Sequence, residues 1–169
     1  MKAFIKALGM LLGRRPPSLQ VAALCVDAET GKVLLITSRG TGRWVIPKGW
    51  PMPGKSLPGA AATEAWEEAG VKGVVATEEI GRYRYDKDQN RGFSVPVEVH
   101  VFVLQVSQLV KDFPEAAERE RRWFDPAEAA TLVREEGLQG ILRSMARPSK
   151  TSSGKGGTIL SSTTRQRAV

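Results

Sequence analysis

Residues 49–71 read GWPMPGKSLPGAAATEAWEEAGV, and this stretch carries the strongest structural signal in the chain. Three glutamates in it, Glu64, Glu67 and Glu68, follow an i, i+3, i+4 spacing in an Ala-rich segment, which places them on one face of a helix. No Lys or Arg lies between them, so their like charges repel unless a cation lies among them. Because Mg²⁺ and Mn²⁺ prefer carboxylate oxygens, the pattern indicates a metal site. A solvated acidic helix face is the alternative, and the three glutamates alone leave both open.

The residues that precede this helix favour the metal site. Residues 47–54 form a rigid loop rich in Gly and Pro rather than a random polar one. The loop contains Lys48, and Arg39 and Arg43 lie shortly before it. These three side chains could hold phosphates opposite the metal. For each of them, a solvated loop charge is the alternative interpretation.

The composition predicts one domain with its own core. The chain has 169 residues, of which 41% are hydrophobic. Its single cysteine, Cys25, lies in an apolar run and is expected in the core, which fits a reducing cytoplasm. The single histidine, His100, excludes a site with several histidine ligands and makes a His-based catalytic triad improbable.

The net charge of +7 comes from the two ends of the chain. Residues 1–20 and 148–169 each hold four basic residues and no acid, whereas the part between them has 17 basic and 18 acidic residues. A basic groove across the folded domain is therefore not indicated, and no specific nucleic-acid partner is expected.

Three regions are expected along the chain. Residues 1–18 form a basic extension whose apolar run is broken by Lys6 and is too short to cross a bilayer, so an amphipathic or frayed helix is expected and no transmembrane segment. Residues 19–147 form the folded domain. Residues 148–169, rich in Ser, Thr and Gly, are expected to be a disordered basic tail.

The pattern within the domain predicts an α+β fold with a sheet packed between helices. The central helix is expected between an N-cap at Ser56 and a left-handed residue at Gly70. Loops are expected at residues 86–93 and 107–118. Strands are expected at 19–27, 32–38, 43–47, 74–85, 95–106 and 119–124, and further helices at 126–133 and 138–146.

Residues 49–71 resemble the Nudix box, whose pattern is Gly, five residues, Glu, seven residues, Arg-Glu, an aliphatic, any residue, Glu-Glu, any residue, Gly and an aliphatic. The spacing is intact, and the matching residues are Gly49, Glu64, Ala65, Glu67, Glu68, Gly70 and Val71. The flanking segments SRGTGRWVIPKG and ERERRWFDPAEA are similar to the branch that includes the diphosphoinositol polyphosphate phosphohydrolases and diadenosine polyphosphate hydrolases. The resemblance covers about residues 19–146 and implies the Nudix fold, a mixed β-sheet sandwich between α-helices.

Two positions depart from the pattern. Lys55 stands where the box has Glu, and Thr63 stands where it has Arg. In the family that Arg orients a box glutamate, so a slower rate is expected here. Lys55 could instead meet substrate phosphate. Thr63 keeps open an alternative function, a catalytically weak Nudix-fold sensor of a nucleotide or phosphorylated ligand.

The resemblance implies a metal-dependent hydrolase that cleaves a diphosphate or polyphosphate bridge, with Mg²⁺ or Mn²⁺ as cofactor. It makes Glu64 and Glu68 metal ligands, Glu67 a ligand or the base that activates water, and the carbonyl of Gly49 a further ligand. Substrate contacts are expected from Arg39, Arg43, Lys48 and Lys55. The expected substrate is a small molecule, either nucleoside diphosphate-linked or of the diphosphoinositol type, and the sequence does not separate these. A monomer or homodimer is expected.

Overall fold

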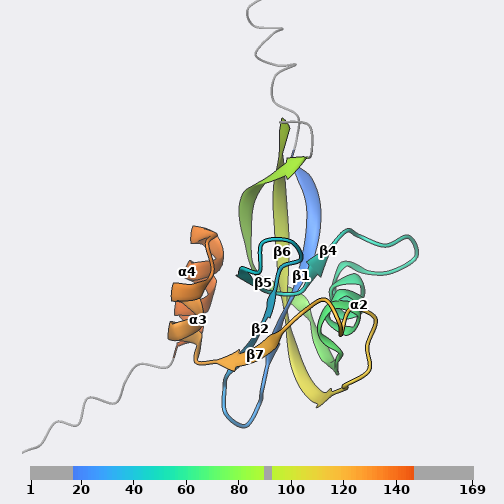
Figure 1. The fold of residues 1–169 in the computed structure, drawn as a ribbon, viewed down its shortest axis with the longest axis vertical. Coiled ribbons are helices and arrows are strands. Elements are labelled where there is room, and N and C mark those ends of the chain that lie inside the picture. The colour runs from blue at the N-terminus through green and yellow to red at the C-terminus, as the bar shows by residue number, and fades with distance from the viewer. Residues whose placement is uncertain (1–16, 90–92, 147–169) are drawn as a thin grey trace, which may run out of the picture.

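A computed structural model describes residues 17–89 and 93–146 (Figure 1). The strands are β1 (Ser18–Val26), β2 (Val33–Thr37), β3 (Trp44–Val45), β4 (Lys48–Gly49), β5 (Val71–Gln89), β6 (Phe93–Leu109) and β7 (Arg121–Phe124). The helices are α2 (Leu57–Ala69), α3 (Pro126–Leu132) and α4 (Glu136–Met145). The expected α+β organisation is confirmed. The order of strands and helices follows the prediction except at β4, which pairs with β1 within the loop expected at residues 47–54.

All seven strands belong to one mixed sheet. Its main path is β3-β2-β1-β6-β5, with β4 paired to β1 and β7 paired to β2. The β1 and β6 strands run parallel from the Ser18–Val97 pair to the Val26–Gln105 pair, and the other pairings are antiparallel. The predicted hairpin between the first two strands is present, and its turn contains Gly31 at φ 71°.

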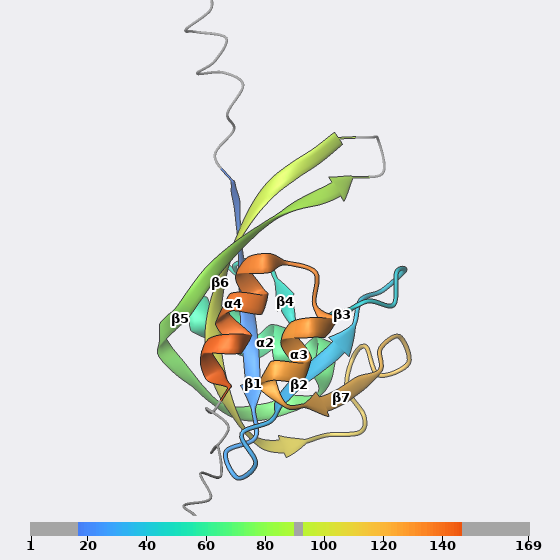
Figure 2. The same ribbon diagram turned by 90° about the vertical axis from the view of Figure 1, so that its left-hand side faces the viewer.

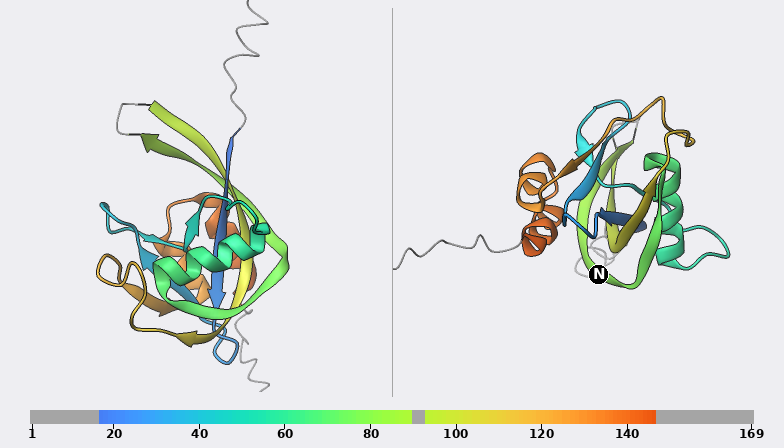
Figure 3. Two further views of the ribbon diagram at one scale, coloured as in Figure 1. Left: turned by 90° about the vertical axis from the view of Figure 1, so that its right-hand side faces the viewer. Right: turned by 90° about the horizontal axis from the view of Figure 1, so that it is seen from below.

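Helices cover both faces of this sheet, as the view from below in Figure 3 shows. Because side chains alternate along a strand, β1 contributes to two cores. Its Ala22 and Leu24 pack in the core that contains α3 and α4, whereas Val21, Ala23 and Cys25 pack in the core that contains α2. The prediction of a buried Cys25 is confirmed, and its side chain is fully buried.

The caps of α2 are those that the sequence predicts. The Ser56 hydroxyl accepts a hydrogen bond from the Gly59 amide at 3.2 Å, and Gly70 ends the helix at φ 63°. The face of α2 that meets the sheet consists of small residues, which lets the helix lie close to the strands; they are Ala60, Ala61, Ala65 and Ala69. This close packing fixes the position of Glu64 and Glu68, which reach the backbone of β4 beside the alanine face.

The prediction of a loop is wrong for residues 86–89 and 93, which belong to β5 and β6, whereas residues 90–92 lie outside the described part of the chain. The β5 and β6 strands continue as a long hairpin, with Asp86 paired to Pro96 and Lys87 paired to Val95 (Figure 2). The polar composition resembles that of a loop because this part of the hairpin extends beyond the core. Its backbone groups are paired in the ladder, and the side chain of Asp86 is exposed. The expected loop at 107–118 likewise begins later, because β6 continues to Leu109.

The α4 helix begins at Glu136, two residues before its expected start. No helix within residues 17–89 and 93–146 is long and apolar enough to cross a membrane. The predictions for the basic extension and the Ser/Thr/Gly-rich tail fall almost entirely outside the described residues.

Candidate active site

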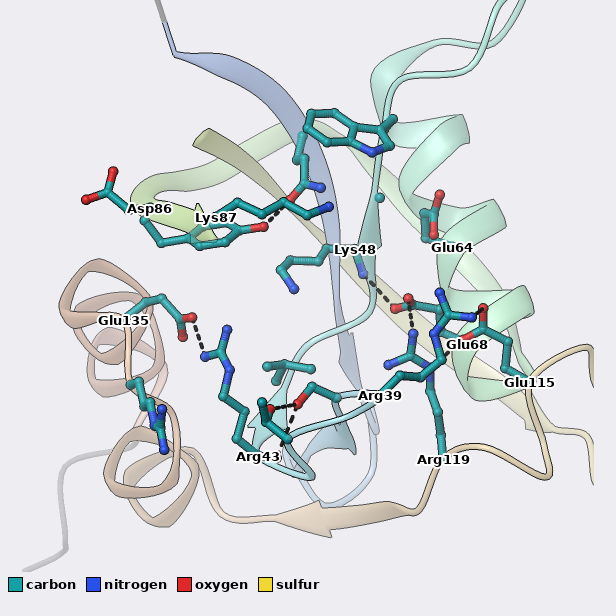
Figure 4. A pocket seen from close by; sticks show the side chains of 18 of the residues that line it. Arg39, Arg43, Lys48, Glu64, Glu68, Asp86, Lys87, Glu115, Arg119 and Glu135 are labelled. Carbon is teal, nitrogen blue, oxygen red and sulfur yellow. Dashed lines mark hydrogen bonds and ion pairs between the residues drawn. The ribbon is translucent and has the colours of Figure 1, made fainter. Parts of the chain in front are cut away.

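A cavity of about 820 Å³ opens beside β4, between α2 on one side and the segment before α4 on the other (Figure 4). Six of the predicted site residues line it: Arg39, Arg43, Lys48, Gly49, Glu64 and Glu68. In Figure 4, Glu64 and Glu68 lie on one side of the cavity and Glu135 on the other, with Lys48 between them. The structure therefore brings most of the predicted acidic and basic residues to one place.

Glu64 lies against the backbone of Gly49. A β-carbon built on Gly49 would stand 2.0 Å from Glu64 Oε1 and 2.5 Å from Oε2, so only glycine allows the carboxylate to occupy this position. Burial, together with the neighbouring carboxylates of Glu68 and Glu67, raises the pKa of Glu64 to about 7. A bound cation would offset the part of this shift that comes from repulsion among the carboxylates.

Glu68 is held by two donors. Its Oε2 accepts a hydrogen bond from the Lys48 amide at 3.0 Å, and its Oε1 forms an ion pair with Arg119 Nη2. Burial raises the pKa of Glu68, while the Arg119 charge and the Lys48 amide oppose that rise. An ionised carboxylate has about four lone-pair positions, so two remain for another ligand.

Arg119 connects α2 to the segment before β7. Besides its contact with Glu68, its Nε donates to Glu115 Oε2 at 2.5 Å and its Nη1 donates to the Thr37 carbonyl at 3.0 Å. The Arg119 side chain is only 6% exposed. A buried guanidinium with three fixed acceptors is a rigid positioning group for the two carboxylates.

Glu115 adds a third carboxylate to the cavity wall. It pairs with Arg119 and lies 3.5 Å from Arg39 Nη1, which also pairs with Glu118 at 3.3 Å. Arg39 is 58% exposed at its side chain, so these two pairs contribute little to stability. Arg39 therefore lies in the cavity lining, where a substrate contact was predicted. Its guanidinium is already paired with Glu115 and Glu118.

Arg43 and Glu135 form an ion pair on the far side of the cavity. Arg43 Nη1 lies 2.5 Å from Glu135 Oε1, and the two side chains are 22% and 6% exposed. The second oxygen, Oε2, is buried without a hydrogen-bond partner among the described residues. Breaking this pair would leave a buried charge uncompensated.

Lys48 lines the cavity between its acidic α2 side and Glu135. Burial lowers the pKa of Lys48, while the charge of Glu68 opposes this shift. Its ammonium lies 5.5 Å from the centre of the Tyr85 ring, and the Tyr85 hydroxyl donates to Gln20 Oε1 at 2.7 Å. No ion pair of Lys48 with another described residue is present, so its charge can meet an anionic ligand.

The two departures from the box pattern contact each other. Lys55 Nζ donates to Thr63 Oγ1 at 2.7 Å, and that hydroxyl donates to the Gly59 carbonyl at 3.0 Å. Neither Lys55 nor Thr63 lines the cavity. The substrate contact expected from Lys55 stays a prediction, which would require this side chain to leave Thr63.

Glu67 also lies outside the cavity lining. It is partly buried on α2, and its backbone carbonyl accepts the Glu115 amide at 3.1 Å, which ties the loop before β7 to the helix. Its expected role as ligand or base stays a prediction, as does a metal contact from the Gly49 carbonyl.

The donor chemistry around Glu64 fits a hard divalent cation. Glu64 and Glu68 present carboxylate oxygens to the same cavity, and no described residue donates a hydrogen bond to Glu64. Within residues 17–89 and 93–146, however, no three Asp, Glu, His or Cys side chains converge closely enough to hold a metal ion. A cation held by Glu64 and Glu68 would therefore keep several water ligands, as Mg²⁺ usually does.

Sequence reasoning missed Arg119, Glu115 and Glu135 as site residues. The i, i+4 spacing of Glu115 and Arg119 was a local signal that the two side chains meet. Nothing in the sequence indicated that Arg119 would reach Glu68, 51 positions earlier in the chain. The position of Glu135 beside Arg43 likewise depends on how α3 and α4 pack on the sheet.

Known proteins resemble most of the described chain in sequence. A family model described as NUDIX domain matches residues 16–145. "Nudix hydrolase 13, mitochondrial" of Arabidopsis thaliana is 33% identical over 131 residues, covering 72% of this chain. The chain spans only 63% of the length of that plant protein. Diphosphoinositol polyphosphate phosphohydrolase 3-alpha of Mus musculus is 33% identical over 118 residues, covering 68% of each chain.

Solved structures with the same fold are more distant in sequence. The Ap4A hydrolase of C. elegans superposes with a TM-score of 0.53 at 19% identity, covering 76% of this chain and 95% of the other. The NUDIX domain of Shewanella oneidensis NrtR, crystallised with ADP ribose, superposes with a TM-score of 0.56 at 18% identity, covering 82% and 95%. At these identities the likeness establishes the fold.

Proposed function

This chain belongs to the Nudix family, and we propose that it is a Mg²⁺- or Mn²⁺-dependent hydrolase that cleaves a pyrophosphate bond in a small-molecule diphosphate or polyphosphate substrate. The observation that carries the proposal is the shared cavity, in which Glu64 and Glu68 face the basic side chains of Lys48 and Arg43. Carboxylates on one side and cations on the other suit a metal-bound phosphoric anhydride.

The acidic side of the cavity would hold the cation. Glu64 and Glu68 are the proposed ligands, supported by the fit of Glu64 against Gly49 and by the two donors that fix Glu68. A bound divalent cation neutralises phosphate charge and lowers the pKa of a bound water. Glu67 remains the proposed base or additional ligand, although in this arrangement its side chain does not line the cavity.

The basic side of the cavity would bind the bridge. Lys48 is placed to offset phosphate charge without first breaking an ion pair among the described residues. Arg43 and Arg39 would add charge at the edges, where Glu135, Glu115 and Glu118 already hold them in place. Because phosphoryl transfer depends mostly on positioning and electrostatics, these fixed cations supply much of what the reaction needs.

The relatives do not fix the substrate of this chain. One is named for diphosphoinositol polyphosphates and a structural neighbour for Ap4A, and both compounds contain phosphoric anhydrides. A cytoplasmic location and a monomer or homodimer are further parts of the proposal. The location rests on the single buried Cys25, whereas the name of the plant relative includes the word mitochondrial.

A substrate panel tests this function. Purified full-length chain would be incubated with dinucleoside polyphosphates, nucleoside diphosphate sugars and diphosphoinositol polyphosphates in Mg²⁺, Mn²⁺ or chelator, with phosphate products identified. We expect cleavage of at least one class only when metal is present, and Glu68→Gln to lower turnover at least 100-fold. Glu128→Gln, an exposed glutamate on α3, is the matched control. Turnover that is undiminished in chelator, or no turnover of any class, would contradict the proposal.

A further inference from the structure

Trp50 places an exposed aromatic ring at the active-site cavity. It follows Gly49, the residue against which Glu64 packs, and it lines the cavity at 45% exposure. The other large hydrophobic residues exposed in the described part of the chain are Val74 and Ile80, and neither lines the cavity. Trp is usually more buried than this, so its position beside the proposed metal site points to a ligand contact.

Lys87 lies beside Trp50 in the lining of the cavity. The Lys87 ammonium, from the β5–β6 hairpin, lies 4.9 Å from the centre of the indole ring. Lys48 lies in a similar way 5.5 Å from the Tyr85 ring. The cavity wall thus carries two aromatic rings, each with a lysine beside it. An aromatic group joined to phosphates matches this arrangement, because the ring can stack while the lysines meet the phosphates.

The charge of the cavity is small once ion pairs are considered. Acidic side chains pair with four of the basic residues that line it: Arg39, Arg43, Arg84 and Arg119. Among the described residues, no ion pair engages the other three, which are Lys48, Lys87 and Arg134. Two lining carboxylates, Glu64 and Asp86, likewise take part in no ion pair among the described residues, so the remaining charge together with a bound metal suits a short phosphate bridge. A densely phosphorylated inositol carries more charge around its ring and offers no π face for Trp50.

We infer that Trp50 is the stacking platform for a nucleobase, so that the substrate is a nucleoside diphosphate or polyphosphate rather than a diphosphoinositol polyphosphate. The inference rests on the proposed function for the chemistry of the bridge and adds the group that the bridge carries. One face of the indole is beside Lys87, and the exposed remainder is open to the base. Lys87 then lies where it can contact the adjacent phosphate.

Kinetics with two substrates test this assignment. For cleavage of Ap4A, Trp50→Ala should raise KM about 5- to 150-fold with kcat little changed, whereas Trp50→Phe should keep most of the affinity. Cleavage of a diphosphoinositol polyphosphate should be slower than that of Ap4A in the wild type and unaffected by Trp50→Ala. Equal losses on both substrates, or a wild-type preference for the inositol compound, would overturn the inference. Cleavage of neither compound by the wild type would instead count against the proposed function.

A binding measurement is independent of turnover. ADP should change the intrinsic tryptophan fluorescence of the wild-type chain, and Trp50→Ala should abolish the change. In calorimetric titration Trp50→Ala should bind ADP about 5- to 150-fold more weakly than the wild type. Trp66→Phe is the matched control, because Trp66 has Lys72 at 5.3 Å from its ring but lies outside the cavity. Unaltered ADP affinity in Trp50→Ala would overturn the stacking role even if the enzyme proved inactive on both substrates.

Discussion

Arg119 holds Glu68 by an ion pair that joins the segment before β7 to the last turn of α2. The family pattern places an orienting arginine inside the box, where this chain has Thr63. Arg119 supplies a buried guanidinium to a box glutamate from outside that motif. The loss of the box arginine therefore does not leave Glu68 without an orienting cation.

Replacing Arg119 should impair both activity and stability. Arg119→Ala leaves Glu68 and Glu115 without their shared partner, so we expect turnover to fall about 10- to 100-fold. Because the pair is largely buried, the free energy of unfolding should fall by about 3–5 kcal/mol. Steady-state kinetics and denaturant unfolding measure the two effects.

Two further variants separate geometry from charge at this position. Arg119→Lys keeps the charge but lacks the planar fork, and should recover only part of the loss. Arg143→Ala removes an exposed arginine on α4 and should behave as the wild type. Wild-type turnover in Arg119→Ala would show that the ion pair does not position Glu68.

Gly49→Ala tests the fit between the loop and α2. The added β-carbon would stand 2.0 Å from Glu64 Oε1, so the carboxylate must move. We expect metal affinity and turnover to fall at least tenfold, as for other changes that misorient a ligand. Gly140→Ala is the matched control, since nothing lies within 4 Å of its added carbon and it should stabilise α4 by about 0.5–1 kcal/mol. Equal metal affinity in both variants would contradict the role of Gly49.

Lys55 and Thr63, the two residues that differ from the box pattern, are hydrogen-bonded, so we expect substitutions of them to have coupled effects. Thr63→Arg alone places a guanidinium beside Lys55, and the like charges should limit any gain in turnover to a few-fold. Lys55→Glu with Thr63→Arg creates an opposite-charge pair and should exceed the single variant. A double-variant cycle in kcat/KM measures the coupling. If neither the wild type nor these variants turn over substrate but all bind a nucleotide or phosphorylated ligand, the chain is a sensor rather than an enzyme.

Replacing Glu67 tests whether this residue has the role that the family pattern gives it, as a metal ligand or a base. Glu67→Gln should lower kcat at least 100-fold if this side chain turns into the cavity to act as base or ligand. Glu128→Gln should leave kcat unchanged. Wild-type kcat in Glu67→Gln would remove Glu67 from the mechanism and agree with its position outside the cavity lining.

Local signals in the sequence predicted much of the fold. A continuous apolar run located β1, and alternating apolar residues located β6. Ser56 and Gly70 bounded α2, because helix caps depend on neighbouring residues. The extended hairpin was missed because residues 86–89 are polar and pair through their backbone. Composition cannot separate such an exposed ladder from a loop.

The site was predicted only where its residues are close in sequence. Spacing alone placed Glu64 and Glu68 together, and the preceding loop brought Lys48 and Gly49 beside them. Arg119 and Glu135 reach the cavity through the pairing of β7 with β2 and the packing of α4 on the sheet. Such contacts depend on tertiary structure, so the sequence pattern carried no sign of them.

The most direct test of the central claim is the calorimetric titration of Mn²⁺ into the wild-type chain and into Glu64→Gln. If Glu64 holds the cation in the cavity, the wild type binds Mn²⁺ and the variant binds it at least tenfold more weakly, while Glu128→Gln binds as the wild type does. Equal Mn²⁺ affinity in the wild type and Glu64→Gln would contradict a metal site at this position.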